Sequence, residues 1–99
     1  MTEAADVAIE REDDSAGGRY VMRYADGSEG EMAYRRVRPG VISIYHTETP
    51  DQHRGHGHAA LMVARGIADA RAEGNRIIPS CSYVAAQFRR HPDWEDLRA

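Results

Sequence analysis

The sequence predicts an α+β domain, a mixed and mostly antiparallel sheet with helices packed on it in the order β-β-β-β-α-β-α. Two observations support this class. The first half of the 99-residue chain consists of short runs of β-forming residues separated by glycine- and aspartate-containing turns. The second half changes to an alanine-rich helical period, interrupted by one short apolar run. The length fits a single domain covering residues 1–99.

Four strands are expected in the first half, and each is a run of β-forming residues between turn residues. They cover residues 6–12, 19–24, 29–37 and 41–47. Asp26-Gly27 is a strong hairpin signal, and Pro39-Gly40 marks a further turn. We therefore expect an antiparallel meander, with Met32 and Tyr34 on one face of the third strand.

A long helix is expected at residues 59–73, because apolar residues recur there at helical spacing. These residues are Ala60, Val63, Ile67 and Ala70. Gly74 should end the helix as a C-cap glycine. Residues 76–79 form a fifth strand. A strand, a helix and a strand in succession predict one parallel pair within the sheet.

A second helix is expected at residues 83–90, with Ser80 or Ser82 as its N-cap. Pro92 should stop this helix. The tail that follows carries Trp94 and Leu97, which we expect to fold back onto the core.

Composition excludes several classes of function. The net charge of −3 does not suggest a general nucleic-acid binder, which usually carries a basic stripe. No apolar run approaches the length of a membrane span, and the acidic N-terminus lacks the pattern of a signal peptide. The single cysteine, Cys81, excludes an intrachain disulfide, so we expect a cytoplasmic protein.

The most informative segment is the glycine-containing turn before the long helix. Gly55 and Gly57 allow backbone N–H groups to approach a ligand with no Cβ in the way. The first N–H groups of a helix lack internal partners and carry the positive end of its dipole. Such a turn suits a phosphate, and Arg54 adds a cation beside it.

Three histidines in the same segment, His53, His56 and His58, raise the alternative of a metal site. A helix N-terminus disfavours a cation as much as it favours an anion, and only Asp51 and Glu48 are nearby acids. We therefore expect no metal. The simplest alternative for the histidines is that all three are solvated loop residues.

Arg54, Gly57 and Ala59 occupy the fixed positions of the R/Q-x-x-G-x-G/A signature of the GCN5-related N-acetyltransferases, so the chain resembles that superfamily. The runs YHTETPDQHRGHG and IIPSCSYVAAQFRRHPDW are similar to its minimal, single-domain branch. Members of that branch have a THTEV-like strand, an RGxGxA turn and a P-x-C-x-[FY]-V segment. The similarity extends from about Arg19 to Leu97.

The resemblance implies that acetyl-CoA lies across the sheet, with its pyrophosphate on the glycine turn. Its pantetheine arm would run between two parted parallel strands, here residues 41–49 and 76–79. The cofactor-binding residues implied in this way are Thr47, Thr49, Arg54, Gly55, His56, Gly57, His58 and Ala59. Thr49 and His58 depart from the usual valine and isoleucine, but neither change removes a backbone donor. The helices that usually cover the substrate between the first two strands are missing, since residues 13–18 are too few to hold them.

Four side chains are candidates for the chemistry. Cys81 follows a strand end near a helix N-terminus, a position that favours the thiolate. The alternative for Cys81 is a packed small residue. His46 and Glu48 share a face of the fourth strand, and either could serve as general base. Tyr83 resembles the tyrosine that acts as general acid in the superfamily, with a core aromatic as the alternative.

We therefore expect an acetyl-CoA-dependent N-acetyltransferase acting on a protein lysine, an N-terminus or a small amine. One alternative is a CoA- or acyl-CoA-binding module without efficient transfer, and another is a small interaction domain that uses its sheet edge. Expected partners are acetyl-CoA and an amine, not nucleic acid or membrane, and the oligomeric state is open. The basic run Arg35, Arg36 and Arg38 is interpreted as a solvated edge or as a docking patch for an acidic partner.

Overall fold

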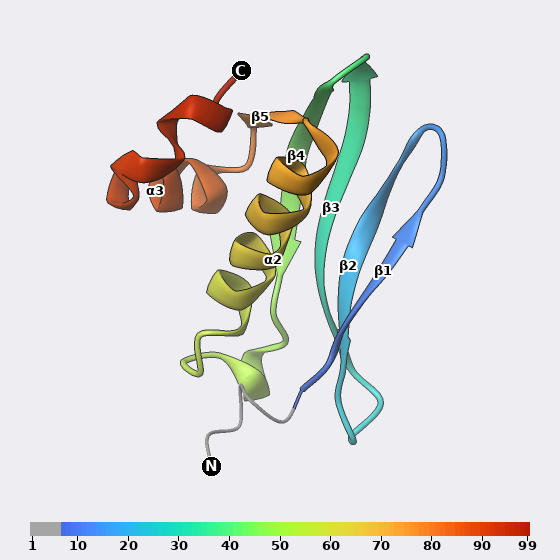
Figure 1. The fold of residues 1–99 in the computed structure, drawn as a ribbon. Helices are drawn as coiled ribbons and strands as arrows, with labels where there is room; N and C mark the ends of the chain where they lie inside the picture. The colour runs from blue at the N-terminus through green and yellow to red at the C-terminus, as the bar shows by residue number, and fades with distance from the viewer. Residues whose placement is uncertain (1–6) are drawn as a thin grey trace.

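A five-stranded sheet in the order β1-β2-β3-β4-β5 forms the frame of the molecule (Figure 1). The computed structural model describes residues 7–99. The strands are β1 (Ile9–Asp13), β2 (Gly17–Arg23), β3 (Glu29–Arg38), β4 (Val41–Glu48) and β5 (Arg76–Pro79). The helices are α2 (His58–Glu73) and α3 (Ser82–Arg90), with short 3-10 turns η1 (Asp51–His53) and η2 (Pro92–Leu97). The predicted α+β class and element order are confirmed.

Pairing in the sheet follows the prediction. Strands β1 to β4 are antiparallel, and β5 joins β4 in parallel. The first strand was expected from Asp6, which lies outside the described residues. Strand β2 begins at Gly17 rather than Arg19, because Asp14 Oδ1 accepts the amides of Ala16 and Gly17 at 2.8 and 3.1 Å and makes the turn very short.

A β-bulge in β4 was not predicted. Tyr34 pairs with Ile44 and Ala33 pairs with His46, so Tyr45 is the extra residue between them. Because of the bulge, Ile44 and Thr47 lie on the same face of the sheet although they are three residues apart. His46 is thereby moved to the opposite face.

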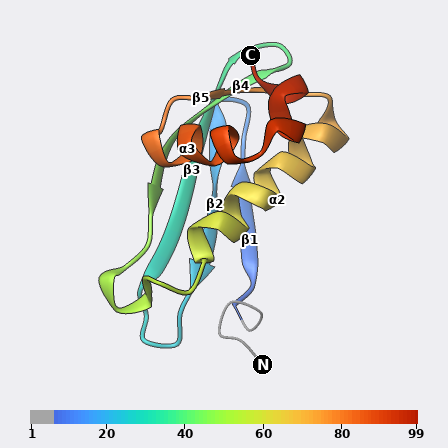
Figure 2. The same ribbon diagram turned by 90° about the vertical axis from the view of Figure 1, so that its left-hand side faces the viewer.

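Both helices cover one face of the sheet, as Figure 2 shows. Helix α2 buries Met62, Val63 and Ile67 against it, and Gly66 lies so close to the sheet that an added Cβ would be 2.9 Å from Met32 Cε. Gly74 adopts the left-handed conformation expected of a C-cap. None of the helices within residues 7–99 is long and apolar enough to cross a membrane.

The N-cap of α3 differs from the prediction. It is Cys81, and neither serine caps the helix. Ser80 does not cap the helix because its side chain makes a tertiary contact instead, with its Oγ 2.6 Å from Ser43 Oγ on β4. The tail behaves as expected: Leu97 is buried, and the Trp94 ring contacts the edge of Phe88 with 5.6 Å between centroids.

Candidate active site

Strands β4 and β5 part in the middle of β4. Their parallel pairing runs from Val41 opposite Arg76 to Ile44 opposite Pro79 and ends there. The Cys81 amide still donates to the Ile44 carbonyl at 2.9 Å, but the chain then turns into α3 while β4 continues to Glu48. The second half of β4 therefore faces the start of α3 across a gap instead of a neighbouring strand.

Cys81 and Thr47 face each other across this gap, with 3.5 Å between Sγ and Oγ1. Burial works to raise the pKa of Cys81. Hydrogen bonding from the Thr47 side chain and from backbone groups of Val84, Tyr83 and Thr47 outweighs this effect and holds the pKa below its ordinary value. The thiol is thus more easily ionised than a free cysteine, as its position at a helix start predicts.

The glycine turn has the conformation that its sequence requires. Gly55 and Gly57 have φ values of 88° and 78°, in the left-handed region that favours glycine. Apart from the glycine and its two chain neighbours, no atom of residues 7–99 lies within 4 Å of the position of a Cβ at either residue, so open space lies over this part of the turn. Gly57 is the N-cap of α2, and the first turn of that helix contains no acidic residue. Amide N–H groups at this helix start are available to an anion.

A cleft of about 340 Å³ joins this turn to the start of α3. It is lined by Thr49, His53, Arg54, Gly55, Gly57, His58, Ala59 and Tyr83. The Thr49 hydroxyl is buried and has no hydrogen-bond partner among residues 7–99, which is costly unless a ligand supplies one. Arg54 Nε donates to the Thr49 carbonyl at 3.2 Å, which places a cation beside the cleft. These features fit a phosphate-containing ligand.

The histidines of the segment are not all solvated loop residues, so that simple interpretation is wrong for two of them. The His53 ring stacks on Tyr24 at 3.6 Å, and its Nε2 lies 2.9 Å from Asp26 Oδ2. The His58 side chain is only 2% exposed, with Nδ1 at 2.6 Å from the Tyr24 hydroxyl. Only His56 is exposed. His58 can therefore serve a ligand through its backbone amide, while its ring anchors the turn.

These positions also bear on the metal alternative. Within residues 7–99, no group of three or more His, Cys, Asp or Glu side chains is arranged to hold a metal ion.

His46 and Glu48 lie on the uncovered face of the sheet. Their cross-strand partners are Ala33 and Glu31, whereas Thr47 pairs with the buried Met32 on the helix-covered face. His46 Nε2 lies 3.5 Å from Glu31 and 3.7 Å from Glu48. The candidate residues are thus divided: Cys81 and Thr47 lie on one side of the sheet plane, and His46 and Glu48 on the other.

Tyr83 lies in the first turn of α3 and lines the cleft. Burial raises the pKa of its hydroxyl, and the charge of Arg90 offsets part of the rise. The hydroxyl therefore remains protonated at neutral pH and is in the correct form to act as a proton donor.

Three residues of the site were missed by sequence reasoning. Tyr24 and Asp26 belong to the β2–β3 hairpin and hold the glycine turn through His53 and His58. Glu31 stands directly opposite Glu48, and like charges in that position are unfavourable unless another group intervenes. The alternation in the third strand could have placed Glu31 on this face, but only a known register pairs it with Glu48.

Two parallel strands that part beside a glycine turn at a helix start form the arrangement that the resemblance to the GCN5-related N-acetyltransferases implies. The family described as GCN5-related N-acetyl-transferase matches residues 19–97. The chain belongs to this family, and it is accordingly an N-acetyltransferase by class.

A solved structure agrees with the fold. The chain is similar to a GCN5-like protein from Staphylococcus aureus, determined by NMR in solution, with a TM-score of 0.72 and 22% sequence identity. The similarity covers 93% of this chain and 87% of the other. At this identity the match supports the arrangement of sheet and helices and carries no information on substrate.

Proposed function

We propose that the protein transfers an acetyl group from acetyl-CoA to a primary amine. The observation that carries the proposal is the parting of β4 and β5 at Ile44, which leads directly to the open glycine turn. Beyond Ile44, no strand among residues 7–99 neighbours the edge of β4 that faces α3, and such an edge can pair with the amide groups of an extended ligand. Acetyl-CoA would supply the reactive thioester.

Each chemical role is assigned to an atom of the chain. The amides of residues 56–59 hold the pyrophosphate, and the Thr49 hydroxyl gains its missing partner there. His46 Nε2, oriented by Glu31 and Glu48, takes the proton of the attacking amine. A new C–N bond replaces the C–S bond, and the Tyr83 hydroxyl gives a proton to the departing thiolate.

Cys81 has one of two roles in this proposal. With the Thr47 hydroxyl 3.5 Å from its sulfur, it either polarises the thioester or accepts the acetyl group transiently. Direct attack by the amine needs no covalent intermediate and is the simpler mechanism, because much of the rate can come from positioning alone. We therefore assign Cys81 the polarising role.

A CoA-binding module without efficient transfer is the second candidate. It is favoured by one observation: within residues 7–99, no helix covers the face of the sheet that carries His46 and Glu48, since β1 and β2 are joined by a short turn. Transfer of acetyl groups to any amine at a rate well above solution aminolysis would exclude it.

Cofactor binding is tested by Gly57→Val. A side chain at Gly57 would fill the open space over the turn, so we expect acetyl-CoA affinity to fall at least about tenfold, or ~1.4 kcal/mol. Isothermal calorimetry measures the loss.

Gly40→Val is the matched control, because Gly40 has the same φ of 78° and equally open surroundings but lies in the β3–β4 turn. Both variants carry the same backbone strain, and only Gly57→Val should lose affinity. Wild-type affinity in a folded Gly57→Val protein would contradict the proposal.

A further inference from the structure

A second hollow lies on the uncovered face of the sheet and has no part in the cofactor site. It is a groove of about 710 Å³ centred on β2 and β3. Its floor includes Gly17 and Ala33, two buried residues whose small size leaves room above the sheet. Tyr45, the bulge residue of β4, lines it with a ring that is 44% exposed, and Arg35 lies over that ring at 4.5 Å from its centroid.

One end of the groove adjoins the proposed general base. Ala33 in the floor is the direct cross-strand partner of His46. Glu31, which also lines the groove, lies 3.5 Å from His46 Nε2. A molecule in the groove can therefore bring an amine to His46 from the face opposite Cys81. The bulge at Tyr45 produces this arrangement, because it turns His46 toward the groove.

The charges in the groove are nearly balanced. Four carboxylates line it, from Glu12, Asp13, Asp14 and Glu31, with three guanidinium groups, from Arg19, Arg35 and Arg36. A lining of this kind favours neither a polycation nor a polyanion. It favours a ligand that carries both signs of charge.

Arg35 differs from the other two arginines of the groove. Arg19 pairs with Glu12 and Glu31, and Arg36 pairs with Asp13. Among residues 7–99, no carboxylate lies within ion-pair distance of Arg35, whose guanidinium carbon instead lies 4.5 Å from the centroid of the Tyr45 ring. An aromatic ring is not a carboxylate partner, so the N–H groups of Arg35 remain available to pair with a planar acid group.

The spacing along β3 sets the length of the ligand. Arg35 lies two residues beyond Ala33, which is about 7 Å along a strand. Resting on the function proposed above, we propose that the groove binds the acceptor, and that the acceptor is a small linear amino acid. Its amine lies at His46 and its carboxylate pairs with Arg35. A lysine within a protein lacks the free acid group, and a diamine would place a second cation against Arg35.

The proposal is tested with two compounds of matched length. The first, 5-aminopentanoate, has the amine and the acid; the second, cadaverine, has an amine at both ends. Acetylation of each by the full chain is measured with acetyl-CoA, and we expect the amino acid to be preferred about tenfold, the worth of one charge-assisted pair. Arg35→Gln should abolish the preference, and Arg35→Glu should reverse it. Arg38→Gln, an exposed arginine of the same strand outside the groove, should retain it.

Binding is measured separately from transfer by NMR titration. We expect 5-aminopentanoate to shift the amide signals of Ala33 and Tyr45 in the wild type and not in Arg35→Gln, whether or not CoA is present. Equal shifts by cadaverine, or equal preference in wild type and Arg35→Gln, would overturn the acceptor assignment even if acetyl-CoA binds. Calorimetry that finds no acetyl-CoA binding would instead overturn the proposed function. The titration would still show whether the groove binds the amino acid.

Discussion

The Cys81 thiol lies where burial and hydrogen bonding act in opposite directions. Burial favours the neutral thiol, while the Thr47 hydroxyl and the backbone at the start of α3 favour the thiolate and prevail. The lowered pKa means that the thiolate fraction at neutral pH exceeds that of a cysteine with its ordinary pKa. Reactivity at this residue is therefore a property of the gap between β4 and α3 rather than of the sulfur alone.

A labelling experiment tests this balance. We expect thiol-reactive probes to modify Cys81 faster than a model thiol at pH 7, and bound CoA to protect it. Thr47→Val keeps the shape of the side chain and removes the hydroxyl, so the rate profile should move to higher pH. Slow labelling that is indifferent to Thr47→Val would show that burial prevails.

Transfer assays separate the two roles of Cys81. In the polarising role, Cys81→Ser and Cys81→Ala reduce the transfer rate several-fold and keep acetyl-CoA affinity. A complete loss of transfer in both variants, with an acetyl-cysteine detected by mass spectrometry in the wild type, would show the covalent role. Unchanged rates in both variants would leave Cys81 as a packed residue and assign the chemistry to His46 and Glu48.

At the level of elements, the β2–β3 hairpin holds the glycine turn in place. The Tyr24 ring stacks on the His53 ring, and the Tyr24 hydroxyl is hydrogen-bonded to His58. Asp26, at the tip of the hairpin, accepts a hydrogen bond from Gln52, and its Oδ2 lies 2.9 Å from His53 Nε2. Ser28 donates to Asp26 from both its hydroxyl and its amide, and these bonds hold the pKa of that carboxyl well below its usual range. A hairpin distant in sequence thus fixes the conformation of the turn.

Tyr24→Phe measures this support. The variant keeps the ring stack and loses the hydroxyl bond to His58, which is worth about 1 kcal/mol. We expect acetyl-CoA affinity to fall about fivefold in calorimetry because the turn becomes less well ordered. Tyr20→Phe is the control, since it removes a part-buried hydroxyl bond to Asp69 from β2, away from the turn. Equal affinity in both variants would show that the hairpin does not position the turn.

The elements could be predicted where local signals define them. The Asp-Gly turn, the C-cap at Gly74 and the fifth strand at residues 76–79 are set by residues within each segment, and all were found as expected. The bulge at Tyr45 could not be predicted, because it depends on which residues of β3 stand opposite β4. The prediction of a serine cap for α3 was wrong for the same kind of reason, since the Ser80 side chain is hydrogen-bonded to a strand that is distant in sequence.

The site follows the same division. The glycine turn and the position of Cys81 at a helix start were predicted from local pattern, and the structure has the left-handed glycines that this pattern requires. The placement of His46 and Cys81 on opposite faces, and the support from Tyr24, arise only when distant strands pair. The backbone conformation of the turn could therefore be predicted from the sequence, whereas the surroundings of each side chain could not.

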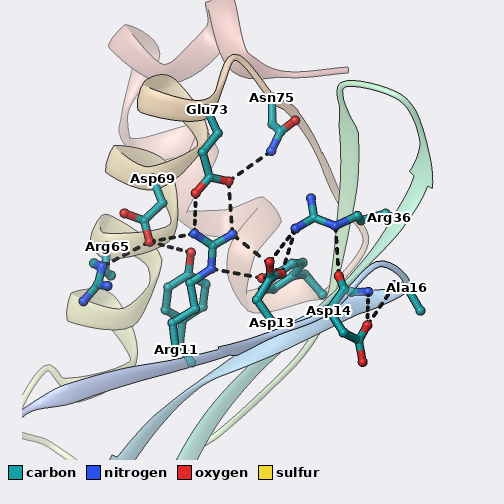
Figure 3. Close-up of polar contacts among 12 residues, drawn as sticks. Arg11, Asp13, Asp14, Ala16, Arg36, Arg65, Asp69, Glu73 and Asn75 are labelled. Atoms are coloured by element: carbon teal, nitrogen blue, oxygen red, sulfur yellow. Dashed lines mark hydrogen bonds and ion pairs between the residues drawn. The ribbon is translucent and has the colours of Figure 1, made fainter.

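Across the whole molecule, ion pairs fasten the first strand to the helix layer. Arg11 on β1 donates to Glu73 and Asp69 on α2 (Figure 3). It also donates to the Tyr34 hydroxyl on β3. Asp13, also on β1, accepts hydrogen bonds from Tyr34 and Arg36. Bonding to Glu73 raises the pKa of Arg11, so its charge is permanent. Asp13 is a carboxylate of this network whose pKa is lowered in the folded protein, so the stability of the fold should depend on its charge in acid.

Acid unfolding tests the contribution of all the carboxylates whose pKa is lowered, of which Asp13 is one. The pKa values of Glu12, Asp13, Asp26 and Asp96 are all lowered in the folded protein. Hydrogen bonding lowers three of these pKa values: the chief partner is Arg19 for Glu12, Ser28 for Asp26 and Arg71 for Asp96. At Asp13, burial works to raise the pKa, but hydrogen bonds from Tyr34 and Arg36 outweigh it. A carboxyl whose folded pKa is depressed stabilises the fold above its unfolded pKa of about 4, and this stabilisation is lost as the pH falls toward the folded value.

We therefore expect urea midpoints to be nearly constant from about pH 7 to 5 and to fall steeply below about pH 4. Asp26→Asn removes one of the shifted groups and should make the acid limb shallower. Asp51→Asn is the control, because that side chain is 87% exposed and its ion-pair partner is Arg54 in its own turn, so the limb should not change. A stability maximum below pH 4, or equal slopes in wild type and Asp26→Asn, would show that these carboxylates do not set the acid stability of the fold.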